Sequence, residues 1–237
     1  MSRAELELDS FALDPYCKLY LPLWKLDGNS FMSKDAYGHL CTNYGSLWTP
    51  QGRSFDGEDD YVDCGNDTSL DITDAITIEA WVKLGAMTTT ENWIVDKSSL
   101  YLISVAGAGS NFYFYLTGAN GAQSVIYAAN FVQNIWYHLV ATYNKDGTFD
   151  VYIDGVNKYS AAATAGAIGI NASNLRIGGK TSGTYYGNFN GLIDEVRIYN
   201  RAAEIGEIKA HYCAGLDRLL ANGLIDQQEY QTRIAIK

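Results

Sequence analysis

Apolar and polar residues alternate with a period of two through most of this chain, and this pattern constrains its fold more than any other feature. From residue 17 to about residue 205, short alternating segments follow one another, separated by turn residues. In the segment 76–83, four apolar residues share one face of the expected strand: Ile76, Ile78, Ala80 and Val82. About a dozen such segments predict an antiparallel β architecture that is closed or built of two layers.

Two of these segments predict a β-hairpin. Residues 135–143 and 149–154 both alternate, and the five residues between them contain Asp146 and Gly147. Asp-Gly favours a tight turn between strands that pair directly. We therefore expect these two strands to be neighbours.

The period changes from 2 to 3.6 near the C-terminus and divides the chain into three regions. Residues 1–16 form an acidic N-terminal arm, residues 17–208 the β region, and residues 209–237 a helical tail. Helices are expected over 202–211 and 216–222, and a last one after Asp226, which is a good N-cap. Short helices bury little by themselves, so the tail must dock on another surface.

Charge and length narrow the possible functions. The chain has 27 acidic and 17 basic residues and a net charge of −10. Binding to a phosphate backbone needs clustered Lys and Arg, so we expect no nucleic-acid partner. No window approaches 18 apolar residues, which predicts no membrane span. The acidic start of the sequence is not a standard signal peptide as written.

The four cysteines are dispersed, and none lies in a CxxC motif. We interpret them as buried or half-buried thiols and expect no zinc site. In an oxidising setting, pairing remains an alternative, with Cys17 and Cys213 as one possible pair. The positions are Cys17, Cys41, Cys64 and Cys213.

Four segments together resemble the laminin G-like, concanavalin A-like lectin/glucanase domains. They are SFDGEDDYVD (54–63), ITIEAWVK (76–83), WYHLVATY (136–143) and GLIDEVRIYNRA (191–202). They occur in the family's order and cover roughly residues 18–208. The resemblance implies an all-β fold, a two-sheet antiparallel jelly-roll sandwich, here with a small C-terminal helical appendage. The tail, residues 216–237, is similar to the small helical SHOCT-type module.

A carboxylate in an apolar row raises the question of a metal ion. Strict alternation over 191–199 places Asp194 on one face with Leu192, Val196 and Ile198, and Glu195 on the opposite face. A buried carboxylate is costly unless it is paired, hydrogen-bonded or bound to a cation.

The resemblance implies one structural Ca²⁺ at this point. Its ligands would be Asp56, the Gly57 carbonyl and Asp194, with Asp60 as a fourth. Oxygen ligands of this kind suit calcium. In the alternative, Asp194 accepts backbone N–H groups and Asp56 only shapes its turn.

We expect no catalytic residues and therefore no enzyme. A glycosidase needs two carboxylates across a cleft, and the one-strand arrangement E-x-D-x-E does not occur in the sequence. No G-x-S-x-G motif occurs either. His138 is expected to pack or to form a hydrogen bond within its strand.

Binding is the expected function, because aromatic residues gather at positions facing away from the predicted core or near its loops. Aromatic rings stack on the apolar faces of sugars. The candidate ligand-binding residues are Trp81, Trp93, Tyr101, Tyr113, Tyr115 and Tyr185, with His138, Tyr152 and Tyr186 beside them.

Two partners are compatible with this aromatic face. The first is a glycan, which would make the chain a carbohydrate-binding or adhesion module. The second is a protein, with the aromatic face and the C-terminal helices making contacts in a homo-oligomer or as a virion structural or decoration protein. We expect a location on an extracellular surface or in a virion, where a protein released by lysis needs no signal peptide.

Overall fold

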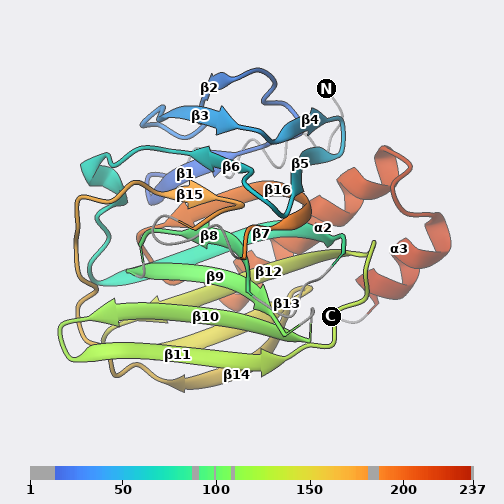
Figure 1. Ribbon diagram of the computed structural model, residues 1–237. Coiled ribbons are helices and arrows are strands. Elements are labelled where there is room, and N and C mark those ends of the chain that lie inside the picture. The colour runs from blue at the N-terminus through green and yellow to red at the C-terminus, as the bar shows by residue number, and fades with distance from the viewer. Residues whose placement is uncertain (1–13, 87–90, 99, 108–109, 181–186, 236–237) are drawn as a thin grey trace.

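The computed structural model describes residues 14–235, except 87–90, 99, 108–109 and 181–186. Most of the expected acidic arm lies outside the described residues. The described part folds as two antiparallel sheets packed face to face, followed by two helices (Figure 1). The prediction of an all-β, two-sheet jelly-roll sandwich with a small helical appendage is confirmed.

The first sheet, called sheet A, contains the first and last strands of the sandwich. Its members are β1 (Cys17–Leu21), β4 (Leu47–Thr49), β5 (Gly52–Asp56), β7 (Ala75–Leu84), β12 (Trp136–Asn144), β13 (Thr148–Ile153), β14 (Val156–Ala162) and β16 (Asn190–Tyr199). Their order is β14-β13-β12-β7-β16-β5-β4, and β1 also pairs with β16. β12 and β13 are neighbours with Tyr143 opposite Phe149, which confirms the predicted hairpin.

The second sheet, called sheet B, is the layer at the front of Figure 1. Its members are β2 (Ser30–Met32), β3 (Leu40–Tyr44), β6 (Tyr61–Asp63), β8 (Asn92–Asp96), β9 (Tyr101–Ala106), β10 (Asn111–Gly118), β11 (Gly121–Ala128) and β15 (Arg176–Ile177). Their order is β11-β10-β9-β8-β15-β6-β3-β2. A 3-10 helix, η1 (Thr68–Leu70), lies in the connection from β6 to β7.

The core fills the space between the two sheets. Alternate residues of β7, including Ile76 and Ile78, are fully buried there, as the periodicity predicts. Phe114 on sheet B stacks on Phe149 of sheet A, with ring centroids 4.4 Å apart and planes 5° from parallel. Contacts of this kind hold the layers together by burying apolar surface from both.

A β-bulge in β16 changes the predicted faces of that strand. Asp194 pairs with Trp81 but Arg197 pairs with Glu79, so β16 has one residue more than β7 over this stretch. Glu195 has a φ of 50°, in the left-handed region that residues other than glycine rarely adopt. The extra residue shifts the alternation after Asp194 by one position.

The bulge places the side chains of β16 differently from strict alternation. Ile193, Val196 and Ile198 all belong to the core between the sheets. Asp194 and Glu195 share the opposite side, where both contact Trp24. The prediction that Asp194 sits in the apolar row, opposite Glu195, is wrong for this reason.

The two helices are α2 (Ile205–Ala221) and α3 (Gln227–Ile234). α2 is continuous through the segment between the two helices expected at 202–211 and 216–222. Asp226 caps α3 as predicted, because its side chain accepts a hydrogen bond of 2.8 Å from the Glu229 N–H. Neither described helix is long and apolar enough to cross a membrane.

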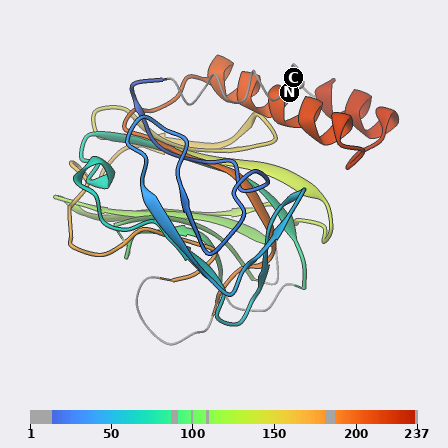
Figure 2. The same ribbon diagram turned by 90° about the horizontal axis from the view of Figure 1, so that it is seen from above.

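Figure 2 shows both helices on one side of the sandwich, over the outer face of sheet A. Three buried residues of α2 pack there, in one cluster with Trp81 and Trp136: Tyr212, Leu216 and Leu219. This apolar side of α2 is used within the chain, so it is not free for a partner.

Candidate ligand-binding face

The expected ligand-binding residues separate onto different surfaces of the sandwich. Trp81 points away from the core as predicted, but α2 covers it and leaves its side chain 1% exposed. Its ring lies 5.7 Å from the ring of Tyr212 and 5.2 Å from that of His138, and these two rings are 6.1 Å from each other. Tyr152, on β13 of the same sheet, is buried against Ala203. Trp81, His138 and Tyr152 therefore do not form a sugar-binding surface.

The prediction that Tyr101 contacts a ligand is also wrong. Tyr101 lies opposite Leu116 of β10 and is fully buried in the core, where its hydroxyl donates a hydrogen bond of 2.9 Å to the Leu70 carbonyl. The strand register therefore turns this ring inward and not toward a ligand. Tyr185 and Tyr186 lie outside the described residues.

The remaining described candidates, Trp93, Tyr113 and Tyr115, lie on the outer face of sheet B, on the side away from the helices. Across β11, β10, β9 and β8 the register places Ile126, Tyr113, Ser104 and Trp93 in one line. Farther along the sheet, Tyr61 of β6 lies opposite Tyr44 of β3. We call this set, together with the neighbouring Tyr115 and Arg176, the aromatic row: Tyr44, Tyr61, Trp93, Ser104, Tyr113, Tyr115, Ile126 and Arg176.

One end of the aromatic row is a stack of rings and a cation. Tyr44 and Tyr61 stack with centroids 4.6 Å apart, and the Arg176 guanidinium lies 4.1 Å from the Tyr61 centroid. Arg176 is held in place by a hydrogen bond of 2.8 Å to the Lys180 carbonyl and by Asp63, 3.7 Å away. Tyr44 remains 47% exposed, so the outside of this stack faces solvent.

The middle of the aromatic row is covered. Trp93 is 5% exposed, and the Lys180 ammonium lies 5.0 Å from the centroid of its ring. The Glu91 carboxyl is close enough to Lys180 for this cation to lower its pKa, although burial has the larger, raising effect. Trp93 thus belongs to the floor of the face, and its ring is not open to a ligand as the sequence led us to expect.

The other end carries the two tyrosines of β10 that the alternation predicts. Tyr113 and Tyr115 both point outward and are half-buried, with ring centroids 6.2 Å apart. The Tyr115 hydroxyl accepts a hydrogen bond of 3.0 Å from Thr117. Burial raises the pKa of Tyr113, while a hydrogen bond with Ser124 opposes the shift. The Tyr113 phenol therefore stays protonated at neutral pH. A tyrosine hydroxyl can donate a hydrogen bond to a sugar hydroxyl.

The four calcium ligands implied by the resemblance do not come together. Asn190 pairs with Asp56, so Asp194 lies four residues farther along β16, about 13 Å away. Asp194 is also engaged elsewhere: it is 2.5 Å from Arg218 of α2 and accepts a hydrogen bond of 3.1 Å from the Trp24 N–H. The alternative in which Asp194 bonds to backbone therefore describes this carboxylate better.

Three carboxylates do cluster at the turn after β5. One ligand atom each from Asp56, Asp59 and Asp60 lies within 4.8 Å of the others. Asp60 also accepts a hydrogen bond of 3.0 Å from the Asp56 N–H, and the backbone N–H of Glu58 donates one of 2.8 Å to the Asp56 carboxylate. These oxygens fit a hard cation such as Ca²⁺. Asp194 does not fit this set.

The described surface also has pockets, and two of them bear on the choice of ligand site. The tryptophan pocket, of about 450 Å³, is lined by Trp24, Trp48, Pro50, Gln51, Asn222 and Leu224. It lies where the turn from α2 to α3 meets the strand connection 50–51. Neither tryptophan lies in a segment of clear alternation, so the residue pattern does not mark them as candidates.

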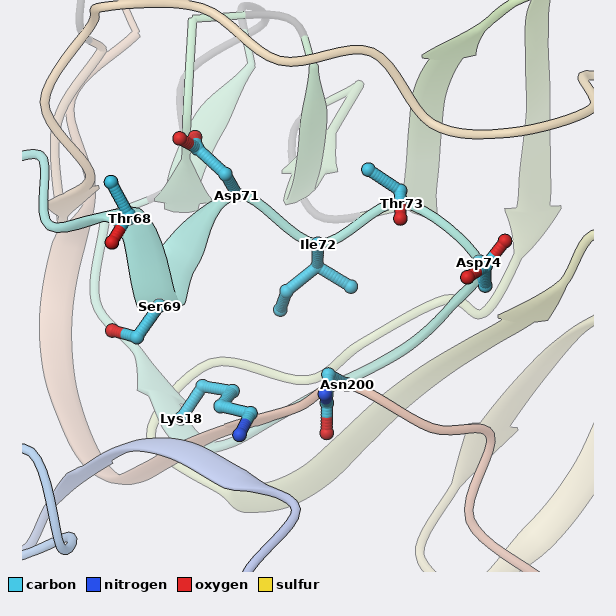
Figure 3. Close-up of a pocket in the computed structure, with 8 residues that line it drawn as sticks. All are labelled: Lys18, Thr68, Ser69, Asp71, Ile72, Thr73, Asp74 and Asn200. Atoms are coloured by element: carbon cyan, nitrogen blue, oxygen red, sulfur yellow. The ribbon is translucent and has the colours of Figure 1, made fainter.

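The second pocket, of about 250 Å³, is shown in Figure 3. Lys18 and Asn200 lie across it from the segment 68–74, and no aromatic ring lines it. Its charges are already engaged: Lys18 donates a hydrogen bond of 3.2 Å to the Pro15 carbonyl, and Asp71 is 3.4 Å from Lys97. It is a poorer candidate for a sugar than the aromatic row.

Comparisons with known proteins place the fold. The sequence model of the concanavalin A-like lectin/glucanases superfamily matches residues 56–209, about two thirds of the chain, and ends before most of the helical tail. A search of curated proteins found no match.

Solved structures with a similar fold include binding domains of Botulinum neurotoxins and of a mosquitocidal protein. The binding domain of Paraclostridial Mosquitocidal Protein 1 is 16% identical with a TM-score of 0.71, and covers 89% of this chain and 53% of its own. The ligand-binding domain of Botulinum neurotoxin serotype D, solved with N-acetylneuraminic acid, is 14% identical with a TM-score of 0.70. The match covers 89% of this chain and 53% of that domain. The binding domain of Botulinum neurotoxin DC, solved with rat synaptotagmin II, is 15% identical with a TM-score of 0.64. The match covers 84% of this chain and 52% of that domain. This chain spans about half the length of each.

Proposed function

The chain belongs to the concanavalin A-like lectin/glucanases superfamily, and we propose that it is a non-catalytic module that binds carbohydrate along the aromatic row of sheet B. The observation that carries this proposal is the outward pair Tyr113 and Tyr115, on a sheet face that the helices leave uncovered. Tyrosine rings offer an apolar face to the C–H groups of a sugar and a hydroxyl to its polar edge.

The dimensions of the face favour an oligosaccharide over a single sugar. The Tyr44–Tyr61 stack on β3 and β6 is four strands away from β10, which corresponds to about 19 Å. Between these two ends the surface carries the charged groups of Glu91 and Lys180. A chain of sugars lying across the strands would reach aromatic rings at both ends and ionic groups between them.

The acidic groups on sheet A support a non-catalytic role. Glu79, Asp194 and Glu195 are at most 1% exposed and are held by cations: Glu79 and Glu195 by Arg197, Asp194 by Arg218. A glycosidase needs two carboxylates that reach the bond to be cleaved. α2 seals these carboxylates from any substrate.

A calcium ion bound by Asp56, Asp59 and Asp60 remains part of the proposal, with Asp194 removed from the ligand set. When bound, the ion would balance three neighbouring negative charges and fix the turn after β5. The adjoining strand β6 carries Tyr61, so the ion would also hold one end of the aromatic row.

A protein ligand on the same face is the second candidate. The exposed groups at the open end of the row are Tyr and Arg, which are also enriched at protein interfaces. The toxin domains that share this fold were solved with a sugar acid in one case and with a protein in another. Both kinds of ligand therefore need to be included in the test.

A glycan array probed with the purified full chain tests the proposal. The array should contain neutral and sialylated oligosaccharides, and hits should be measured again by calorimetry. We expect Tyr113→Ala and Tyr115→Ala each to weaken binding about fivefold, since one aromatic contact contributes about 1 kcal/mol.

Two control variants locate the site. Tyr159→Ala removes a tyrosine that is 37% exposed on sheet A, outside the aromatic row, and should leave affinity unchanged. Trp48→Ala alters the tryptophan pocket. Loss of binding in Trp48→Ala alone would move the site to that pocket, and an array without any hit would favour a protein ligand.

A further inference from the structure

Two of the four cysteines face each other on neighbouring strands. β3 and β6 pair with Thr42 opposite Asp63 and Asn43 opposite Val62. The same register places Cys41 directly opposite Cys64. Both thiols point into the core, with side chains 0% and 2% exposed.

The backbone hydrogen bonds show which kind of pair this is. The Cys64 N–H donates to the Leu175 carbonyl at 2.9 Å, on the side away from β3. The Asn43 N–H donates to the Asn29 carbonyl at 2.8 Å, on the side away from β6, and Cys41 two residues earlier has the same orientation. Cys41 and Cys64 therefore form a non-hydrogen-bonded pair, in which the two strands approach most closely.

This geometry fits a disulfide. The Cα atoms of a non-hydrogen-bonded antiparallel pair are about 4.5 Å apart, and the Cβ atoms are close to the same distance. A disulfide requires Cα atoms about 4.4–6.8 Å apart and Cβ atoms about 3.5–4.5 Å apart. The strands need no rearrangement to accept the bond.

The surroundings single out this pair among the four cysteines. The neighbouring Cys41 thiol, together with burial, raises the pKa of Cys64. The Cys41 thiol itself donates a hydrogen bond of 3.6 Å to the His39 carbonyl. Cys17 instead packs with Tyr20 and Tyr199, and Cys213 lies on α2. All four are free thiols in the structure. Cys17 and Cys213 belong to different side-chain clusters, which does not favour the pairing of these two that the sequence left open.

We propose that Cys41 and Cys64 form a disulfide across β3 and β6 when the chain meets a low-molecular-weight disulfide such as oxidised glutathione. One cysteine thiolate attacks the glutathione disulfide and releases one glutathione thiolate. The second cysteine thiolate then attacks the mixed disulfide and releases the other. The two cysteines lose two protons and two electrons in total, and one glutathione disulfide is reduced to two glutathione molecules.

The bond would act at the edge of sheet B. β3 and β2 are the last two strands of that sheet, and β2 has no further described neighbour. A link from β3 to β6 would pin this edge ribbon, which carries Tyr44 of the aromatic row. Since both thiols are buried, the exchange takes place during folding or while the edge is transiently open.

The experiment starts from the fully reduced full-length chain, refolded in mixtures of reduced and oxidised glutathione. Free thiols are then alkylated under denaturing conditions, and the chain is digested with trypsin. Cleavage after Lys34, Arg53 and Lys83 separates the two cysteines, so mass spectrometry would find peptide 35–53 linked to peptide 54–83, lighter by two hydrogen atoms than the sum. We expect Cys17 and Cys213 to be alkylated.

The melting temperature gives a second readout. Oxidation should raise it by several degrees in the wild-type chain and in Cys17→Ala, but not in Cys41→Ala or Cys64→Ala. If either core variant fails to fold, the peptide map of the wild-type chain still decides. Four alkylated cysteines at every oxidising ratio, or a link that involves Cys17 or Cys213, would overturn the proposal.

Discussion

His211 on α2 places its Nδ1 2.9 Å from Oε2 of Glu79 on β7, and this contact joins the helical tail to the centre of sheet A. Arg197 of β16 donates a hydrogen bond of 3.2 Å to the same carboxylate and another of 2.7 Å to Glu195. Trp24 and Tyr20 donate to Glu195 in turn. The tail thus closes over a buried polar network and not over a purely apolar face.

Replacing Glu79 should therefore destabilise the whole protein. Burial by itself would raise the pKa of Glu79, but His211, His138 and Arg197 together hold it well below its usual range. The stabilisation is thus present above pH 4.5 and is lost as pH falls through the folded-state pKa. Glu79→Gln removes one of the charged partners of Arg197. We expect the free energy of unfolding, measured in urea at pH 7, to fall by about 3 kcal/mol.

The control for this change is Glu204→Gln. Glu204 is exposed at the start of α2, and its side chain forms no capping hydrogen bond. It undergoes the same change of charge and volume and should alter stability by less than about 0.5 kcal/mol. Equal effects of the two substitutions would contradict a structural role for the buried network.

Asp194 gives a prediction for the dependence of stability on pH. Burial raises the pKa of Asp194 from 3.8 to about 7. The positive charge of Arg218 lowers this pKa, and the negative charge of Glu195 raises it further. The folded protein then holds this proton more tightly than the unfolded chain does. Its contribution to stability is complete below about pH 4 and is lost as pH rises toward 7.

Urea unfolding of the wild type and Asp194→Asn between pH 4.5 and 7.5 measures this contribution. Asn cannot titrate, so the free energy of unfolding of the variant should fall less steeply with pH, whatever its absolute value. Glu204→Gln should keep the wild-type slope. Parallel curves for the wild type and Asp194→Asn would show that Asp194 stays ionised throughout, paired with Arg218.

Calcium binding is predicted at Asp56, Asp59 and Asp60. Calcium should raise the melting temperature of the wild type, and EGTA should reverse the rise. Asp59→Asn should remove the shift in melting temperature. Asp59 is exposed, so the main effect of losing its charge would be weaker binding of the ion. Asp194→Asn should retain the shift. If it does not, Asp194 belongs to the ligand set after all; an absent shift in the wild type would remove the site.

The residue pattern predicted correctly which side of each regular strand faces the core. It did not predict whether the other side is exposed, because a distant part of the chain can cover that side. The alternation identified Ile76 of β7 as a core residue and Tyr113 of β10 as facing outward. Trp81 was also assigned correctly to the outer side, yet the helix that covers it begins more than 120 residues later. Nothing in the local pattern around β7 reveals that cover.

The predicted position of Asp194 was wrong for a local reason. Strict alternation holds only while both strands advance one residue at a time, and the bulge at Glu195 breaks this condition. The alternation pattern does not reveal a non-glycine residue with positive φ. The bulge was therefore missed, and Asp194 was assigned to the same face as the core residues Val196 and Ile198. The turn at 56–60 was identified correctly as acidic, because a turn of this kind is encoded locally by Asp and Gly.

Two glycines of α2 provide a sharp test of how the tail docks. A Cβ atom at Gly215 would lie 2.4 Å from three atoms of the Trp81 ring, whereas one at Gly206 would meet nothing within 4 Å. Alanine is the better helix former at both positions. Gly206→Ala should therefore raise the free energy of unfolding by about 0.5 kcal/mol.

Gly215→Ala should lower the free energy of unfolding by about 1–2 kcal/mol, because the clash with the buried indole outweighs the gain in helix propensity. Tryptophan fluorescence should change only in this variant, as Trp81 or α2 shifts. Chemical denaturation of both variants under the same conditions measures the difference. If both substitutions stabilise the protein equally, α2 does not pack against Trp81 in solution, and Trp81 would then be free to join a ligand-binding surface.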